Sequence, residues 1–211
     1  MESADRLLTA GEPFGRASGA MIMVHGRGGS AAGILELRHE FPDTGFAYVA
    51  PQAAGHTWYP NSFLAPLESN EPALSSGLAL LQDVLGRTAA AGLPLERTIV
   101  LGFSQGACLA LEFAARNGRS LGGVVGLSGG LIGPPGTEWS YEGSLAGTPV
   151  FLGCSDMDPH IPIERVQETA AIFERLGASV TERIYPGLGH TINRDEIRNA
   201  IRMMEVIAAR I

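Results

Sequence analysis

Short apolar runs alternate with segments of helical periodicity along nearly the whole chain. Apolar runs that end at glycine or proline are typical of strands buried on both faces of a parallel sheet. The expected strands are 20–24, 46–49, 98–103, 123–127, 149–154 and 180–185. The expected helical segments begin at Ser30 and continue with 74–91, 105–117, 163–176 and 195–209. This alternation predicts an α/β fold, with an open, mostly parallel sheet and helices on both faces.

Length and composition predict a single domain over residues 1–211 and exclude several classes of enzyme. The chain has 211 residues, of which 45% are hydrophobic, enough to bury a substantial core. All 15 basic residues are arginine. Enzymes that use a lysine amine, such as Schiff-base aldolases, pyridoxal-phosphate enzymes and Ser-Lys hydrolases, are therefore excluded. The net charge of −7 leaves no basic field for a nucleic acid, so no such partner is expected.

The sequence indicates a cytoplasmic protein with no membrane insertion. No apolar run approaches the roughly 18 residues that span a bilayer. The N-terminus has acidic residues where a secretory signal has basic ones, and no apolar segment follows. Cys108 and Cys154 form no C-x-x-C pair, so we expect two buried, reduced thiols. No cofactor is expected.

Two segments match the G-x-S-x-G pattern of a serine nucleophile, at Ser104 and at Ser128. The pattern alone is weak in a chain with 28 glycines. A nucleophile needs a strand before the serine and a helix directly after it, so that a tight turn exposes the hydroxyl. Ser104 has both, whereas glycines and prolines after Ser128 prevent a helix. We expect Ser104 to be the nucleophile and Ser128 to be a turn residue near the site.

A serine nucleophile needs a histidine to take its proton and a carboxylate to orient that histidine. Of five histidines, His190 lies in a glycine-rich loop between the last strand and the last helix, where a base can reach over the sheet edge. His25 is expected to bind the backbone near the end of its strand. No metal-ligand spacing is found among the histidines, which argues against a metal hydrolase. For the acid, the segment after strand 149–154 offers both Asp156 and Asp158.

The chain resembles the phospholipase/carboxylesterase family of α/β-hydrolases, which includes the acyl-protein thioesterases. Four segments carry the resemblance: VHGRGG at 24–29, GFSQG at 102–106, DPHIP at 158–162 and YPGLGH at 185–190. The resemblance implies that the acid is Asp158, directly before proline, and that Asp156 is a residue on the solvent side or one that braces the loop. It also implies that the backbone N–H groups of Arg27 and Gln105 bind the oxyanion.

Arg27 departs from the acyl-protein thioesterases, which have an apolar residue followed by Gly-Asp where this chain has Arg27 followed by two glycines. Its side chain is expected either to be solvated or to contact an acidic group of the substrate. The departure concerns the choice of substrate more than the mechanism.

A long loop at 52–72 contains three prolines and several aromatic residues. It follows a strand, so it should emerge on the same edge of the sheet as Ser104, and we expect it to be exposed rather than part of the core. Trp58, Tyr59 and Phe63 are candidate substrate-binding residues, or alternatively they anchor the loop to the body or a partner subunit in a possible homodimer.

The sequence thus predicts a cofactor-free serine hydrolase that cleaves short to medium acyl or aryl carboxylic esters through an acyl-enzyme. The expected partner is a small-molecule ester or thioester. Two alternatives stay open: a thioesterase, and a noncatalytic ligand-binding protein on the same fold.

Overall fold

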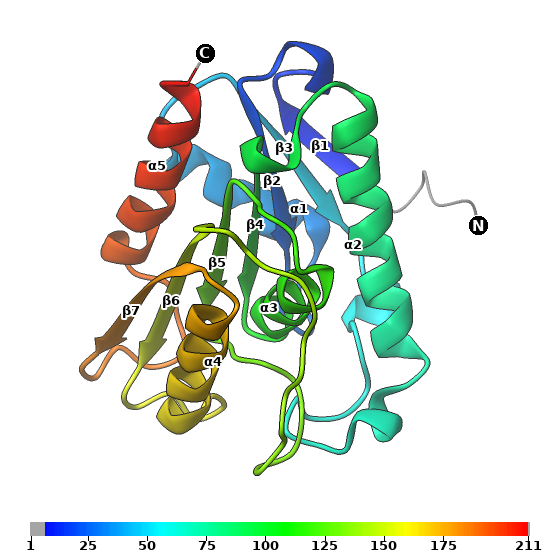
Figure 1. Cartoon of the computed structure of the whole chain (residues 1–211), viewed down its shortest axis with the longest axis vertical. Coiled ribbons are helices and arrows are strands. Elements are labelled where there is room, and N and C mark those ends of the chain that lie inside the picture. The colour runs from blue at the N-terminus through cyan, green and yellow to red at the C-terminus, as the bar shows by residue number, and fades with distance from the viewer. Residues whose placement is uncertain (1–6, 211) are drawn as a thin grey trace.

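The computed structural model describes residues 7–210, which contain a seven-stranded sheet (Figure 1). Its strands are β1 (Leu7–Gly11), β2 (Gly19–Val24), β3 (Phe46–Pro51), β4 (Thr98–Phe103), β5 (Gly123–Leu127), β6 (Pro149–Ser155) and β7 (Ser179–Tyr185). Their order across the sheet is β1-β3-β2-β4-β5-β6-β7. β1 runs antiparallel to β3, and every other neighbouring pair is parallel. The predicted α/β fold with a mostly parallel sheet is therefore confirmed.

Helices cover both faces of this sheet (Figure 1). Helices α2 (Ala73–Ala90), α3 (Gln105–Asn117) and α4 (Ile163–Arg175) pack into the larger core cluster on one face. Helices α1 (Ala31–Leu35) and α5 (Arg194–Ala208) pack into the second cluster on the other. Short 3-10 helices lie at Phe14–Arg16, Glu36–Glu40, Ala54–His56, Leu67–Asn70 and Leu95–Arg97. No helix within residues 7–210 is long and apolar enough to cross a membrane.

The predicted strands and long helices agree with the structure to within about two residues at each end. The central strands β2 and β4 are buried almost throughout, which explains their continuous apolar runs. The sequence prediction missed β1. Within the sheet this edge strand pairs only with β3, and most of its residues are exposed, so it has neither a continuous apolar run nor a regular alternation.

The topology brings the predicted site residues to one edge of the sheet. The loop after β2 contains residues 25–29, and the loop after β3 contains residues 52–72. Ser104 follows β4, Asp158 follows β6 and His190 follows β7. Because these strands are parallel, their carboxyl ends meet at a common edge, which is where open α/β sheets bind ligands.

Candidate active site

Ser104 sits on a strained turn between β4 and α3. Its backbone has φ of 57° and ψ of −123°, a conformation that L residues rarely adopt. The turn brings backbone segments so close that a Cβ on Gly102 would collide with the Gly106 carbonyl, and one on Gly106 would collide with Val24. Both glycines of the G-x-S-x-G pattern are thus required by close approach. The turn leaves Ser104 at the N-terminus of α3.

Three side chains from three different loops form one chain of hydrogen bonds. Nε2 of His190 lies 2.8 Å from Oγ of Ser104, and Nδ1 of His190 lies 2.7 Å from Oδ2 of Asp158. With the proton on Nδ1, His190 donates to Asp158 and accepts from the Ser104 hydroxyl. The His190 side chain is 20% exposed and the Asp158 side chain is fully buried. Such a chain can transfer the serine proton to histidine while a carboxylate stabilises the imidazolium.

Asp158 is held as an ionised acceptor by four groups. Its Oδ1 accepts the backbone N–H groups of His160 at 2.9 Å and Ile161 at 3.1 Å, and its Oδ2 faces both His190 and the Cys154 thiol. Burial raises the pKa of Asp158, but the bond from His190 and the two backbone N–H groups outweigh it, so the pKa lies below its usual value.

Asp156 and Ser155 brace the loop that carries His190. Asp156 is exposed, and its Oδ1 accepts the N–H of Gly187 at 2.7 Å. The Ser155 hydroxyl accepts the N–H of Gly189 at 2.9 Å. The structure thus places Asp156 beside the loop, as expected of a bracing residue, and places Asp158 next to His190.

Ser128 lies apart from this chain of hydrogen bonds. It is 1% exposed, has φ of 52°, and is not among the residues that line the cavity at Ser104. Its N–H donates to the Gly153 carbonyl at 2.7 Å. Ser128 is therefore a buried turn residue after β5, and nothing brings His190 to it.

Two backbone donors beside Ser104 are unused. Arg27 lies in the loop after β2, and Gln105 is the first residue of α3. Among residues 7–210, neither backbone N–H has a hydrogen-bond acceptor, whereas the N–H of Gly28 donates to the His56 carbonyl at 2.8 Å. Arg27 and Gln105 border the same cavity as Ser104. A developing oxyanion at Ser104 needs two donors of this kind.

A cavity of about 490 Å³ opens at Ser104 and His190. Its remaining walls are the segment 59–63, Cys108, His160 and Ile161. Burial raises the pKa of Cys108 to about 12, so this thiol stays protonated at neutral pH and is no rival nucleophile. The volume lies at the small end of the range for ligand pockets.

The aromatic residues of the 52–72 loop do not form the exposed surface that the sequence led us to expect. Trp58, Tyr59 and Phe63 are only 3%, 1% and 7% exposed and belong to the larger core cluster. Trp58 is not among the residues lining the cavity, and its indole N–H donates to the His25 carbonyl at 2.7 Å. Tyr59 and Phe63 do line the cavity. The expectation that this loop cannot be core was wrong, because an aperiodic segment does not reveal which of its side chains turn inward.

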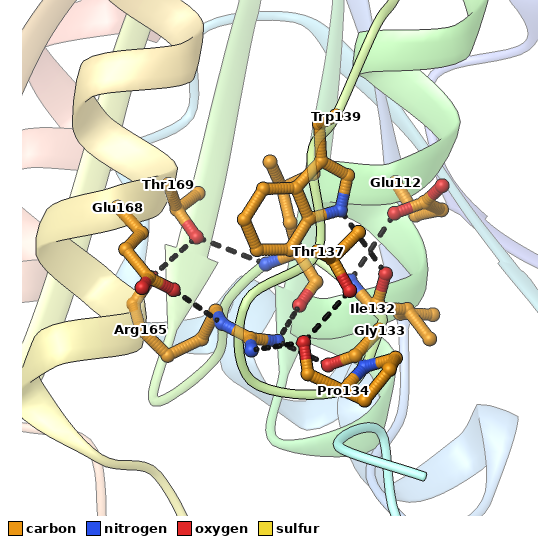
Figure 2. Close-up of polar contacts among 10 residues, drawn as sticks. Glu112, Ile132, Gly133, Pro134, Thr137, Trp139, Arg165, Glu168 and Thr169 are labelled. Atoms are coloured by element: carbon orange, nitrogen blue, oxygen red, sulfur yellow. Dashed lines mark hydrogen bonds and ion pairs between the residues drawn. The ribbon is translucent and has the colours of Figure 1, made fainter. Parts of the chain in front are cut away.

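The Phe63 wall is supported by Arg165 of α4, whose polar contacts are shown in Figure 2. The Arg165 guanidinium donates to the carbonyls of Leu131 and Gly133 at 2.8 and 2.7 Å, and it pairs with Glu168 at 2.9 Å. It lies 4.8 Å from the ring centre of Trp139 and 5.8 Å from that of Phe63. Figure 2 shows the loop after β5 wrapped around this buried cation. α4 therefore holds that loop and one side of the cavity together.

Two further histidines lie near the site: His25 has the structural role expected of it, whereas the sequence interpretation did not predict that His160 would line the cavity. His25 bonds the backbone as expected, with Nδ1 2.7 Å from the Gly26 carbonyl and Nε2 accepting the Ala53 N–H. His160 lines the cavity, and its ring meets that of His190 edge-on at 4.8 Å between centres. The available signal was its position two residues after Asp158, inside the D-P-x-I-P segment.

Comparison with known proteins gives a consistent family assignment. The model of the family described as Phospholipase/Carboxylesterase matches residues 11–208. The crystal structure of a phospholipase/carboxylesterase from Dyadobacter fermentans is 44% identical, with a TM-score of 0.90 over 95% of this chain and 96% of that one.

Curated relatives are more distant. Acyl-protein thioesterase 1 of Eremothecium gossypii is 27% identical over 88% of this chain and 86% of its own length. A probable carboxylesterase of rice is 29% identical over 84% of this chain and 73% of its own length. Matches to several other fungal acyl-protein thioesterases span about half of those proteins, for example 49% of the Debaryomyces hansenii protein at 29% identity.

Proposed function

The chain belongs to the phospholipase/carboxylesterase family, a family of hydrolases, and on that premise we propose that it is a serine hydrolase that cleaves carboxylic esters through an acyl-enzyme. One observation carries the proposal: Asp158, His190 and Ser104 form a continuous chain of hydrogen bonds that ends at a cavity. The substrate and the roles of these residues are our inference, and the geometry supports them.

In the first half of the reaction, Oγ of Ser104 attacks the acyl carbon while Nε2 of His190 takes the hydroxyl proton. The buried Asp158 carboxylate stabilises the imidazolium and holds the tautomer that can accept from serine. The N–H groups of Arg27 and Gln105 bind the oxygen that gains negative charge. Collapse of the tetrahedral intermediate breaks the bond to the leaving group, which departs with the proton from His190.

In the second half, water attacks the acyl-enzyme, and His190 takes one of its protons. The same two N–H groups bind the second oxyanion. Its collapse releases the carboxylic acid, and His190 returns the proton to Ser104. No step requires a cofactor.

The cavity favours short to medium acyl or aryl groups. Its volume of about 490 Å³ is bounded by the apolar side chains of Phe63 and Ile161. A long lipid chain would extend beyond these walls into water and gain little apolar burial from its outer carbons. We expect kcat/KM for p-nitrophenyl esters to rise with the first few methylenes and then to level or fall. A continuous rise up to palmitate would contradict this substrate class.

Labelling with a fluorophosphonate tests the mechanism directly. The wild-type protein should gain one covalent adduct, located on Ser104 by peptide mass spectrometry, and Ser104→Ala should gain none. Ser128→Ala is the matched control, because Ser128 has the same sequence pattern and a similar φ without access to His190. It should label like wild type. If the wild-type protein binds an ester but the fluorophosphonate does not label it, the result would favour the alternative of a noncatalytic ligand-binding protein.

A thioesterase remains the second candidate, and the match to the Eremothecium gossypii acyl-protein thioesterase over most of both chains supports it. Thioesters and esters pass through the same acyl-enzyme, so the leaving group distinguishes them. Comparing kcat/KM for an S-butyryl thiol and the corresponding butyryl ester on the same enzyme would decide the preference.

A further inference from the structure

The Arg27 side chain is bound to the protein, a role that the sequence did not lead us to expect. Its guanidinium donates to three successive carbonyls of the segment 59–61: Tyr59 at 3.0 Å, Pro60 at 2.9 Å and Asn61 at 2.6 Å. It makes no ion pair with any carboxylate of residues 7–210. Three of the five N–H donors of this guanidinium are used in this way, so the side chain is anchored to the protein rather than freely solvated.

The Gln105 side chain binds the chain at the beginning of the same segment, at Trp58 and Tyr59. Its Oε1 accepts the backbone N–H of Trp58 at 3.0 Å, and its Nε2 donates to the Tyr59 carbonyl at 2.8 Å. Gln105 is 6% exposed, so these bonds are shielded from water. The Tyr59 carbonyl therefore accepts from both Arg27 and Gln105.

These two residues are the ones whose backbone N–H groups face the oxyanion in the proposed mechanism. Arg27 and Gln105 lie far apart in the sequence, on the loop after β2 and at the start of α3. Gln105 is fixed by the helix that it begins. Arg27 lies on an exposed loop, and a direct link from it to Gln105 runs through the carbonyl of Tyr59.

We propose that the Arg27 guanidinium is a positioning residue: it fixes the segment 59–61 to the loop after β2 and so sets the distance between the two oxyanion donors. This inference rests on the proposed function and deepens it. Without the cation, the carbonyls of Pro60 and Asn61 lose this donor while that of Tyr59 keeps Gln105, and residues 60–61 turn outward to water. The N–H of Arg27 then loses one of the contacts that fix its place relative to that of Gln105.

The proposal makes a specific kinetic prediction for Arg27→Ala. Oxyanion donors act on charge that exists only in the transition state, so displacing one lowers kcat and leaves KM nearly unchanged. Complete loss of a donor lowers kcat about 100- to 1,000-fold in known cases, so displacement should lower it about 10- to 100-fold. The fold should persist, because Gly28 and Trp58 hold the two loops together by separate bonds, to His56 and His25.

Added guanidinium supplies a test that a merely structural role would fail. Arg27 is exposed, so millimolar guanidinium chloride can reach the space left in Arg27→Ala and donate to the same carbonyls. We expect it to restore at least part of kcat in this variant and to leave wild type unchanged. Arg16→Ala, which removes an exposed arginine that pairs with Glu12, is the control and should show neither loss nor rescue.

The substrate arm uses p-nitrophenyl acetate and its acidic counterpart, p-nitrophenyl hydrogen succinate. Equal loss of kcat on both, with rescue by guanidinium, supports the positioning role. Loss confined to the acidic ester, unchanged kcat on both, or loss without rescue would each overturn it. Fluorophosphonate labelling of wild-type Ser104 distinguishes failure of this inference from failure of the proposed function. If Ser104 is labelled and Arg27→Ala has the kcat of wild type, only this inference is refuted. If the wild-type protein is not labelled, the mechanism on which the inference rests is refuted.

Discussion

Replacing Asp158 by asparagine should abolish most turnover for a reason that the geometry makes explicit. Oδ1 of Asp158 accepts the N–H groups of His160 and Ile161, so an asparagine at this position must place its amide oxygen there. Its NH2 group then faces Nδ1 of His190, 2.7 Å from the replaced oxygen. Because that NH2 donates, His190 must carry its own proton on Nε2, where it can no longer accept from Ser104.

The size of the effect follows from this wrong tautomer and from the loss of a buried negative charge. In known triads the same change lowers kcat by about 10,000-fold with the geometry intact. The Asp158 side chain is fully buried, so water cannot substitute for the carboxylate. We expect a loss of similar order here, with KM changed little.

Asp156→Asn is the matched control, since the same substitution is made two residues away. Asp156 accepts one N–H, from Gly187, and an asparagine oxygen can accept it equally well. Steady-state hydrolysis of a p-nitrophenyl ester, with circular dichroism to verify folding, measures both variants. Activity of Asp158→Asn within tenfold of wild type, or an equal loss in Asp156→Asn, would refute the assignment of the acid.

Three further outcomes are expected. Burial raises the pKa of Glu196 from its usual 4.5 to about 7, so the folded state holds that proton to higher pH than the unfolded chain and stability falls as the pH rises between these values. The shift corresponds to roughly 3 kcal/mol of unfolding free energy. In urea unfolding, Glu196→Gln should therefore gain stability relative to wild type as the pH rises from 5 to 8. A difference in unfolding free energy between the two proteins that stays constant over this range would contradict the prediction. Ile161→Val enlarges the cavity by one methylene and should raise the relative kcat/KM for the next longer acyl chain about fourfold; an unchanged chain-length profile would place the acyl group elsewhere. Ser128→Ala should keep turnover within about twofold of wild type, because the proposed triad chemistry runs through Ser104; a large loss with intact folding would reopen the choice of nucleophile.

Much of the fold could be predicted because apolar runs buried on both faces leave an unmistakable pattern. β4 and α3 have the predicted bounds, and the order of strands and helices places Ser104 between them. Asp158 could be chosen as the candidate acid only with the family resemblance, since the residues alone left Asp156 and Asp158 equally open. The choice between them depends on which carboxylate the turn directs toward His190, and that direction is set by backbone geometry after β6.

The 52–72 loop shows where sequence reasoning failed. Its prolines and lack of period correctly indicated an irregular segment. They gave no indication that Trp58 and Tyr59 would be almost completely buried, because burial there depends on contacts with segments distant in the chain, such as the Trp58 bond to His25.

The sequence by itself determined the layered α/β fold, the order of the site-bearing loops and the choice of Ser104 as the candidate nucleophile, because hydrophobic period and flanking elements are local properties of the chain. Only the tertiary structure decided what the side chains of Arg27 and Gln105 do. Their principal partners are backbone groups of the segment 58–61, and every residue carries a carbonyl while nearly every residue carries an N–H. No residue type marks such a partner in advance, so the link between the two proposed oxyanion donors becomes visible only once the chain has folded.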